Sequence, residues 1–300
     1  MRGLVVRSQS GFYLVKTHDG LLTCQLRGRM KKGPRLGDMV SIGDWVEVTL
    51  GKGGSGVIEA VEPRKRLLSR SDPTPRGEYQ QIIIANPDLA VFVFACAEPA
   101  PRYGMLDRFL VIAEKQSIPA MIVANKTDLV GMEEAKRLFS HYPSLGYPVI
   151  YTSATLHSGI DELRSRLSGK ISVFAGPSGV GKSSLLNILL PNLDISTAHV
   201  SQASNTGKHT TVVREMYANP DGGYIADTPG LRTLAFWDIQ LEELDGFFPE
   251  FRQLVAQCRF SDCTHDHEPG CAVKAAVARG EVHPARYRSY LSIRMGEEMD

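Results

Sequence analysis

The stretch from Gly176 to Ser183 reads G-P-S-G-V-G-K-S and constrains the fold more than any other part of the chain. A short apolar strand is expected before it at 171–175, and helix-forming residues follow at 184–190. A glycine-rich turn between a strand and a helix lets successive N–H groups point at phosphate oxygens, and the helix N-terminus adds partial positive charge. The pattern therefore predicts a nucleoside triphosphate site. A plain turn without a ligand is the less favoured interpretation.

The residues of this loop have expected roles in holding the phosphates. Lys182 would reach the β- and γ-phosphates, which also makes it a candidate catalytic residue, and the hydroxyl of Ser183 would bind Mg²⁺. The other contacts are expected from Gly176, Ser178, Gly179, Val180, Gly181 and Ser184.

The sequence N-K-T-D follows an apolar strand expected at 120–124. A carboxylate at Asp128 would accept hydrogen bonds from N1–H and the exocyclic amine of guanine, a donor pair that adenine lacks. Asn125 would meet O6 of the base, and the stem of Lys126 would cover its face. The motif therefore favours guanine over adenine as the base, and a polar turn is the alternative.

A second short motif, T-S-A, follows a strand expected at 148–151. Ser153 and Ala154 match the element whose backbone N–H supports the guanine carbonyl. Together with N-K-T-D, it strengthens the prediction of a guanine nucleotide.

The sequence D-T-P-G follows a strand expected at 223–226. Asp227 would hold Mg²⁺ through water, and the N–H of Gly230 would sense the γ-phosphate. The next residue is Leu231, whereas Ras-like enzymes carry a water-orienting glutamine there. Leucine cannot orient water, so intrinsic hydrolysis should be slow or another residue must do this work.

The candidate for this work is His209, followed by Thr210 and Thr211, at the end of a polar stretch that begins at 196. One of the two threonines would complete the Mg²⁺ shell when the γ-phosphate is present, and Thr211 is favoured over Thr210. His209 would position or activate the attacking water. The alternative is a surface histidine in a mobile loop.

The order of these motifs is unusual. Small GTPases begin with the phosphate loop and end with the base-reading motifs, whereas here N-K-T-D and T-S-A come first. The alternation of apolar strands and helices between 89 and 226 predicts a doubly wound α/β domain. The motif order then predicts a circular permutation of a P-loop GTPase, which surface termini permit.

Residues 1–66 show short strand patterns separated by turn residues and hold 12 Lys/Arg against 6 Asp/Glu, a net charge of +6. The size and strand number predict a small β-barrel of the OB-fold type, with an SH3-like barrel as the alternative. Five basic residues crowd one expected loop at 27–35. Such a loop on an OB barrel is a natural contact for nucleic acid.

Together, these patterns predict three domains, at residues 1–66, 67–235 and 236–300. A linker is expected at 63–77, because this stretch is rich in proline and charge. The last domain is expected to be mainly helical, with helical spacing at 241–251, 251–258, 272–280 and 284–295.

Four residues of the last domain form a C-x4-C-x-H-x5-C pattern: Cys258, Cys263, His265 and Cys271. Three thiolates and one imidazole suit tetrahedral zinc, and with no open position the site should be structural. His267 is a possible substitute ligand, and unliganded cysteines are the alternative.

The permuted motif order, with G-K-H-T-T before D-T-P-G and C-x4-C-x-H-x5-C at the end, resembles the RsgA family, also called YjeQ or YloQ. The resemblance covers essentially the whole chain. It implies a GTPase that converts GTP to GDP, binds the 30S ribosomal subunit and its 16S rRNA late in maturation, is stimulated by that subunit and is then released. His209 falls where the family has its proposed catalytic histidine. Lys208 and Val212 depart from the usual G-R-H-T-T-T.

Two other functions remain open from the residues: a P-loop kinase or ATPase acting on a small molecule, and an RNA-binding module with a structural nucleotide. Asp128 argues against the first, and intact Lys182, Ser183 and Asp227 argue against the second. No apolar run approaches the roughly 18 residues of a membrane span, and the first residues lack a signal-peptide core. We therefore expect a cytoplasmic protein without membrane contact. We also expect a monomer, with other assembly factors as further partners.

Overall fold

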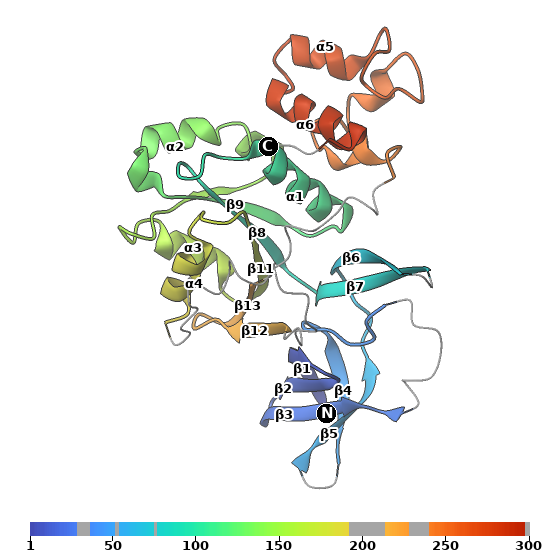
Figure 1. Cartoon of the computed structure of the whole chain (residues 1–300), viewed down its shortest axis with the longest axis vertical. Helices are drawn as coiled ribbons and strands as arrows, with labels where there is room; N and C mark the ends of the chain where they lie inside the picture. Colours follow the sequence, from blue (N-terminus) through green and yellow to red (C-terminus); the bar gives the residue numbers. More distant parts are fainter. Residues whose placement is uncertain (29–36, 52–53, 75–76, 192–213, 228–239, 298–300) are drawn as a thin grey trace. The chain divides into compact units, whose positions relative to one another are not determined.

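The computed structural model describes residues 1–28, 37–51, 54–74, 77–191, 214–227 and 240–297 (Figure 1). The chain divides into two compact units. The first comprises residues 1–91, 161–178 and 182–235, and the second comprises residues 92–160, 179–181 and 236–300. The domain boundaries placed after residues 66 and 235 stay predictions.

The N-terminal part of the first unit is a closed barrel of five strands (Figure 1). The strands are β1 (Arg2–Gln9), β2 (Phe12–Thr17), β3 (Gly20–Leu26), β4 (Trp45–Leu50) and β5 (Gly56–Val61). Their order is β1-β2-β3-β5-β4, and β4 pairs back with β1. The β3–β5 pair is parallel, whereas the other neighbours are antiparallel. The predicted barrel is confirmed, and this closure fits an OB-fold.

Alternate residues of these strands point inward and fill the barrel. The buried set from the strands is Val5, Tyr13, Val15, Cys24, Val46, Val48 and Ile58, and Val40 joins it from the segment before β4. A glycine is needed at Gly56, because a Cβ there would lie 2.4 Å from Sγ of Cys24. These side chains fill the interior of the barrel.

A parallel pair in the first unit carries the phosphate loop. Strand β11 (Lys170–Ala175) pairs in parallel with β13 (Gly223–Asp227), and α4 (Lys182–Leu189) follows the loop. Strand β12 (Arg214–Ala218) pairs antiparallel with β13 on one side and with β1 of the barrel on the other. The barrel and the phosphate-loop strands therefore belong to one hydrogen-bonded sheet.

The other α/β elements lie between residues 89 and 167. They are β8 (Leu89–Ala95), α1 (Tyr103–Lys115), β9 (Ala120–Asn125), η3 (Thr127–Leu129), α2 (Met132–Leu138), η4 (Pro143–Leu145), β10 (Val149–Tyr151) and α3 (Ile160–Leu167). Strands β9 and β10 pair in parallel. All residues of β8 and residues 121–125 of β9 are buried, as expected for strands covered on both faces, whereas Ile150 is the buried residue of β10. The predicted α/β class is confirmed.

The C-terminal part of the second unit has fewer helices than its sequence spacing indicates. Helices α5 (Ala272–Ala278) and α6 (Pro284–Met295) form as predicted, but only the short 3-10 turns η6 (Leu244–Phe247) and η7 (Val255–Gln257) occupy the region expected to be helical at 241–258. Phe248 is extended, with φ −105° and ψ 100°. Pro249 explains this, because proline disfavours the helical conformation in the preceding residue.

The stretch predicted as a linker at 63–77 is instead part of a hairpin. Strands β6 (Leu67–Thr74) and β7 (Gly77–Ala85) pair along their full length. Main-chain groups of β7 bond to the segment after the basic loop: Ile82 N–H donates to Oδ2 of Asp38 at 3.1 Å, and Ala85 N–H donates to Ile42 O at 2.9 Å. The linker prediction was wrong because it took the prolines as evidence against a strand. Both strands of a two-stranded sheet are edge strands, where proline is tolerated.

A buried charge cluster joins α1 to α6 in the second unit. Arg286 is fully buried, and its guanidinium lies 2.7 Å from Oδ1 of Asp107 and 2.7 Å from Oε1 of Glu250. Tyr142 donates to the same oxygen of Asp107 at 3.0 Å. Burial alone would lower the pKa of Arg286, but the two carboxylates outweigh it and raise that pKa. The cluster fixes the C-terminal elements on α1.

Replacing Arg286 by alanine should leave two buried carboxylates without their counter-ion. We expect the free energy of unfolding to fall by about 3–5 kcal/mol, measured by urea denaturation. Arg288→Ala, at an exposed position of the same helix, is the control and should change it by less than about 0.5 kcal/mol. Equal stability of the two variants would contradict this prediction.

Candidate functional site

The predicted guanine-reading segment begins where β9 ends. Asn125 is fully buried, and both ends of its amide are engaged: Nδ2 donates to Val180 O at 2.8 Å, and Oδ1 accepts from Oγ1 of Thr152 at 3.0 Å. The amide thus joins N-K-T-D to the centre of the phosphate loop and to the T-S-A segment. This structural use of Asn125 was not predicted, and neither was the role of Thr152.

The structure brings Asp128 and Ser153, which belong to the two predicted base-reading motifs, into direct contact. Oγ of Ser153 donates to Oδ1 of Asp128 at 2.5 Å, and Leu156 N–H donates to that same Oγ at 3.1 Å. Asp128 is exposed, whereas Ser153 is buried. The serine therefore holds the carboxylate in one orientation and leaves the other oxygen available to a ligand. Ala154 follows directly and is half-buried.

Lys126 adopts a left-handed conformation, with φ 61°, between β9 and η3. Its Nζ donates to the backbone oxygen of Glu98. This contact holds the lysine stem along the loop after β8, in the second unit with Asp128.

The phosphate loop connects β11 to α4 as predicted. Gly179 and Gly181 have φ values of 77° and 87°, which side-chain-bearing residues rarely adopt. A Cβ at Gly181 would also lie 2.3 Å from Nδ2 of Asn125. Gly176 and Val180 are buried, and Ser178 and Ser184 are exposed. The conformation thus depends on glycine at position 181, which the G-x-x-x-x-G-K-S motif specifies, and also at position 179, which the motif leaves open.

Lys182 and Ser183 begin α4, so their N–H groups lie in the first turn of the helix. Lys182 is 7% exposed and Ser183 is half-buried. In the same unit, Asp227 ends β13 opposite Phe174 of the parallel strand β11. The pairing therefore places Asp227 at the strand ends from which the phosphate loop leaves. His209, Thr210, Thr211 and Gly230 lie outside the described residues.

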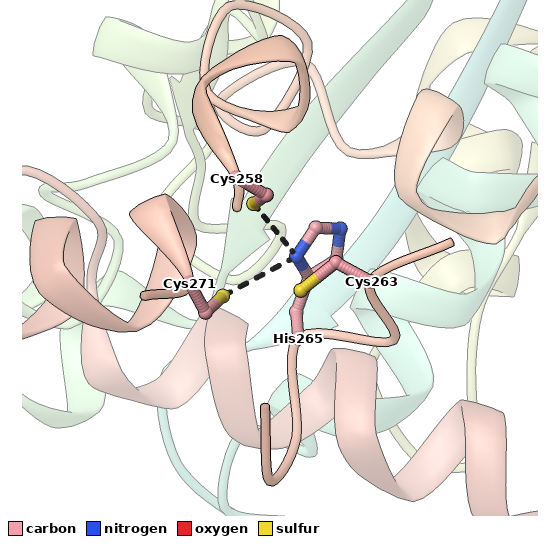
Figure 2. A group of neighbouring side chains, drawn as sticks. All are labelled: Cys258, Cys263, His265 and Cys271. Carbon is pink, nitrogen blue, oxygen red and sulfur yellow. Dashed lines mark hydrogen bonds between the residues drawn. The ribbon is translucent and has the colours of Figure 1, made fainter. Parts of the chain in front are cut away.

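The four predicted zinc ligands come together in the second unit (Figure 2). One donor atom from each of Cys258, Cys263, His265 and Cys271 lies within 4.8 Å of the others. His267 is excluded as a substitute, because it is exposed and faces Asp266. Burial, with smaller effects of the neighbouring thiols, raises the pKa of Cys263 to about 12. A divalent cation would let such clustered thiols ionise, so the donor set fits zinc.

Backbone groups around the cluster support this interpretation. At the start of α5, Ala272 N–H points at Sγ of Cys258 at 3.4 Å, and Lys274 N–H points at Sγ of Cys271 at 3.5 Å. Such donors stabilise thiolates. The arrangement is therefore suited to a closed structural metal centre.

Glu268 organises the turn that carries His265, although no sequence pattern indicated this. Its carboxylate accepts from Thr264 N–H at 2.8 Å, from Oγ1 of Thr264 at 2.5 Å and from Asp266 N–H at 3.1 Å. Desolvation raises the pKa of Glu268, but these bonds outweigh it and lower that pKa to about 2. The carboxylate therefore stays ionised and holds the turn.

Comparisons with known proteins agree over nearly the whole chain. The sequence model described as RsgA GTPase matches residues 61–237, and the RsgA N-terminal domain model matches residues 2–58. The Small ribosomal subunit biogenesis GTPase RsgA of Gemmatimonas aurantiaca is 44% identical, with 97% of this chain and 96% of the relative covered. The protein of the same name from Moorella thermoacetica is 42% identical, with 97% and 96% covered.

Two solved structures are similar over nearly the full length. The crystal structure of YjeQ from Thermotoga maritima gives a TM-score of 0.79 at 37% identity, and covers 98% of this chain and 97% of its own. The structure of YloQ, described as a circularly permuted GTPase, gives 0.75 at 32% identity, covering 98% and 94%.

Asp128→Asn should weaken GTP binding by roughly 10- to 100-fold, because the amide replaces a charged acceptor by a donor. Binding of xanthosine triphosphate, whose C2 oxygen accepts from that amide, should improve. Fluorescence titration with both nucleotides, and with ATP as competitor, measures this. Glu133→Gln, at an exposed position of α2, is the control. Unchanged GTP affinity in Asp128→Asn would contradict the base-reading role.

The purified protein should contain one zinc ion per chain, held by the four-residue cluster. We expect Cys271→Ser to lose most of this zinc, because serine replaces a thiolate by a weak ligand. Cys24→Ser, in the barrel core, should keep its zinc. Atomic absorption of dialysed samples measures the content, and equal zinc in both variants would refute the assignment.

Proposed function

The chain belongs to the RsgA family of GTPases, and we propose that it hydrolyses GTP to GDP and phosphate while acting in late maturation of the 30S ribosomal subunit. The observation that carries the proposal is the bond between Ser153 and Asp128, in a chain that matches proteins named small ribosomal subunit biogenesis GTPase over 97% of its length. Binding to the subunit stimulates hydrolysis, and hydrolysis is coupled to release.

The nucleotide is held by two sets of residues. Asn125, Lys126, Asp128, Ser153 and Ala154 hold the guanine base. The loop from Gly176 to Ser184 holds the phosphates, with the N–H groups at the start of α4 and the ammonium of Lys182 meeting the negative charge.

Ser183, Asp227 and Thr211 form the magnesium site in this proposal. Mg²⁺ neutralises phosphate charge when bound. The hydroxyls of Ser183 and Thr211 coordinate directly, whereas Asp227 acts through water. The N–H of Gly230 reports the γ-phosphate to the segment that follows it.

In this proposal His209 positions the attacking water. Ras-like enzymes use a glutamine for this work, but this chain has Leu231 at that position. This role rests on the sequence, where His209 adjoins Thr210 and Thr211. Contact with the subunit aligns the histidine, so turnover is slow until the partner is bound.

Basic residues of the barrel bind 16S rRNA, and the zinc-binding part supplies a second contact. The net charge of +6 in residues 1–66 supports this. A separate observation supports coupling between the barrel and the GTPase part: Arg7 of β1 pairs with Glu215 of β12, and β12 follows the segment that contains His209 and Thr211. A change in that segment would be transmitted to the barrel through this pairing.

The protein works in the cytoplasm as a monomer in this proposal, with other assembly factors as further partners. Within the described residues, the structure contains no helix that is both long and apolar enough to cross a membrane. A small-molecule kinase or ATPase is not favoured, because Asp128 supplies the carboxylate that guanine recognition needs and Ser153 holds that carboxylate in one orientation.

The decisive experiment measures GTP hydrolysis with 30S subunits, with 50S subunits and with neither. We expect stimulation by 30S alone. His209→Ala should retain GTP binding and lose about 10²-fold or more of the stimulated rate. His199→Ala, ten residues earlier in the same segment, is the matched control.

Stimulation by 50S subunits as strong as by 30S would contradict the assignment of the partner. Full stimulated turnover in His209→Ala would refute the role of the histidine while leaving the rest of the proposal standing.

A further inference from the structure

The two ring nitrogens of His265 face different groups. Nδ1 lies 3.4 Å from Sγ of Cys271 and 3.6 Å from Sγ of Cys258 (Figure 2). Nε2 lies on the other side of the ring, 3.3 Å from Oδ2 of Asp245. The imidazole is fully buried. Nδ1 is therefore the nitrogen available to a metal held among the thiols, and Nε2 must carry the proton.

We propose that Asp245 is the positioning carboxylate of this metal centre. By accepting the Nε2–H of His265, it fixes the tautomer in which Nδ1 keeps its lone pair for zinc. A hydrogen-bonded carboxylate also raises the basicity of a ligating imidazole. Asp245 lies outside the C-x4-C-x-H-x5-C motif, so motif spacing does not reveal it.

The contacts of Asp245 require both oxygens of a carboxylate. Oδ1 accepts from Gly246 N–H at 2.7 Å, while Oδ2 faces Nε2 of His265. An asparagine has one acceptor oxygen and would have to turn its NH₂ toward one of these two donors. If the NH₂ faces the ring, the proton is driven to Nδ1, where it blocks the metal.

The other described neighbours of the ring cannot replace Asp245. Phe251 and Tyr290 contact the imidazole through their rings, at centroid distances of 6.0 and 5.8 Å. The hydroxyls of Tyr287 and Tyr290 donate to backbone oxygens of the turn, at 2.6 and 2.9 Å. These contacts orient the turn, whereas Asp245 supplies the acceptor for Nε2.

The proposal links the metal to the segment that follows D-T-P-G. Asp245 lies on η6, the first element after residues 228–239, beside the fully buried Leu244. Nη1 of Arg294 donates to Leu241 O at 2.8 Å, which pins the same segment to α6. Zinc, acting through His265 and Asp245, therefore anchors residues 241–247.

Zinc affinity, measured by competition with a chromogenic chelator, tests the positioning role. Asp245→Asn should bind zinc about 10- to 100-fold more weakly than the unmodified protein. Asp262→Asn is the charge-matched control, since this exposed carboxylate lies between Cys258 and Cys263 in sequence. Equal affinity of Asp245→Asn and the unmodified protein, or an equal loss in both variants, would overturn the proposal.

Thermal unfolding after chelator treatment separates positioning from a fold defect. If Asp245 acts through the metal, the unmodified protein and Asp245→Asn should have the same melting temperature once zinc is removed. A much lower melting temperature for metal-free Asp245→Asn would overturn the positioning role. Hydrogen exchange at residues 241–247 should quicken when zinc is removed from the unmodified protein. Unchanged exchange there would overturn the link to η6.

Discussion

The buried amide of Asn125 is the interaction on which the proposed base-reading part of the nucleotide site depends. It bonds to Val180 in the phosphate loop and to Thr152 beside the Asp128–Ser153 pair. Three segments that are distant in sequence thus meet at one side chain, in a buried position where hydrogen bonds are strong and an unpaired group is costly. The permuted order of the motifs is tolerated because these contacts depend on spatial position and not on chain order.

Local structure was largely predictable from the sequence. Helix α6 begins with proline and is followed by Gly296 at φ 69°, the signals that start and end a helix. Strand β11 and the phosphate loop were likewise predictable, since the glycines impose the backbone path. The hairpin β6–β7 and the broken helix around Phe248 were not predictable. Around Phe248 the following proline outweighs the helical spacing, and in the hairpin the partners of β7 are distant in sequence.

Candidate site residues could be named from the sequence where one motif supplies the chemistry, and the structure brings the four predicted zinc ligands, Cys271 among them, into one cluster. The residues that hold functional side chains or whole elements in place could not be predicted. Arg286 and Asp107 are 179 residues apart, and Asp245 lies 20 residues from His265. Ion pairs and outer carboxylates of this kind leave no periodic signal, because only the folded chain brings them together.

Strand β1 belongs both to the barrel and to the sheet that carries the phosphate loop. Its first residues pair with β4 and close the barrel, whereas Arg7 and Ser8 pair with β12. Without the barrel, β12 would present an open row of backbone donors and acceptors, which invites pairing with another molecule. The barrel therefore cannot be removed without exposing an edge of the GTPase sheet. Evolution or design could exchange it only for a domain that offers a strand in the same register.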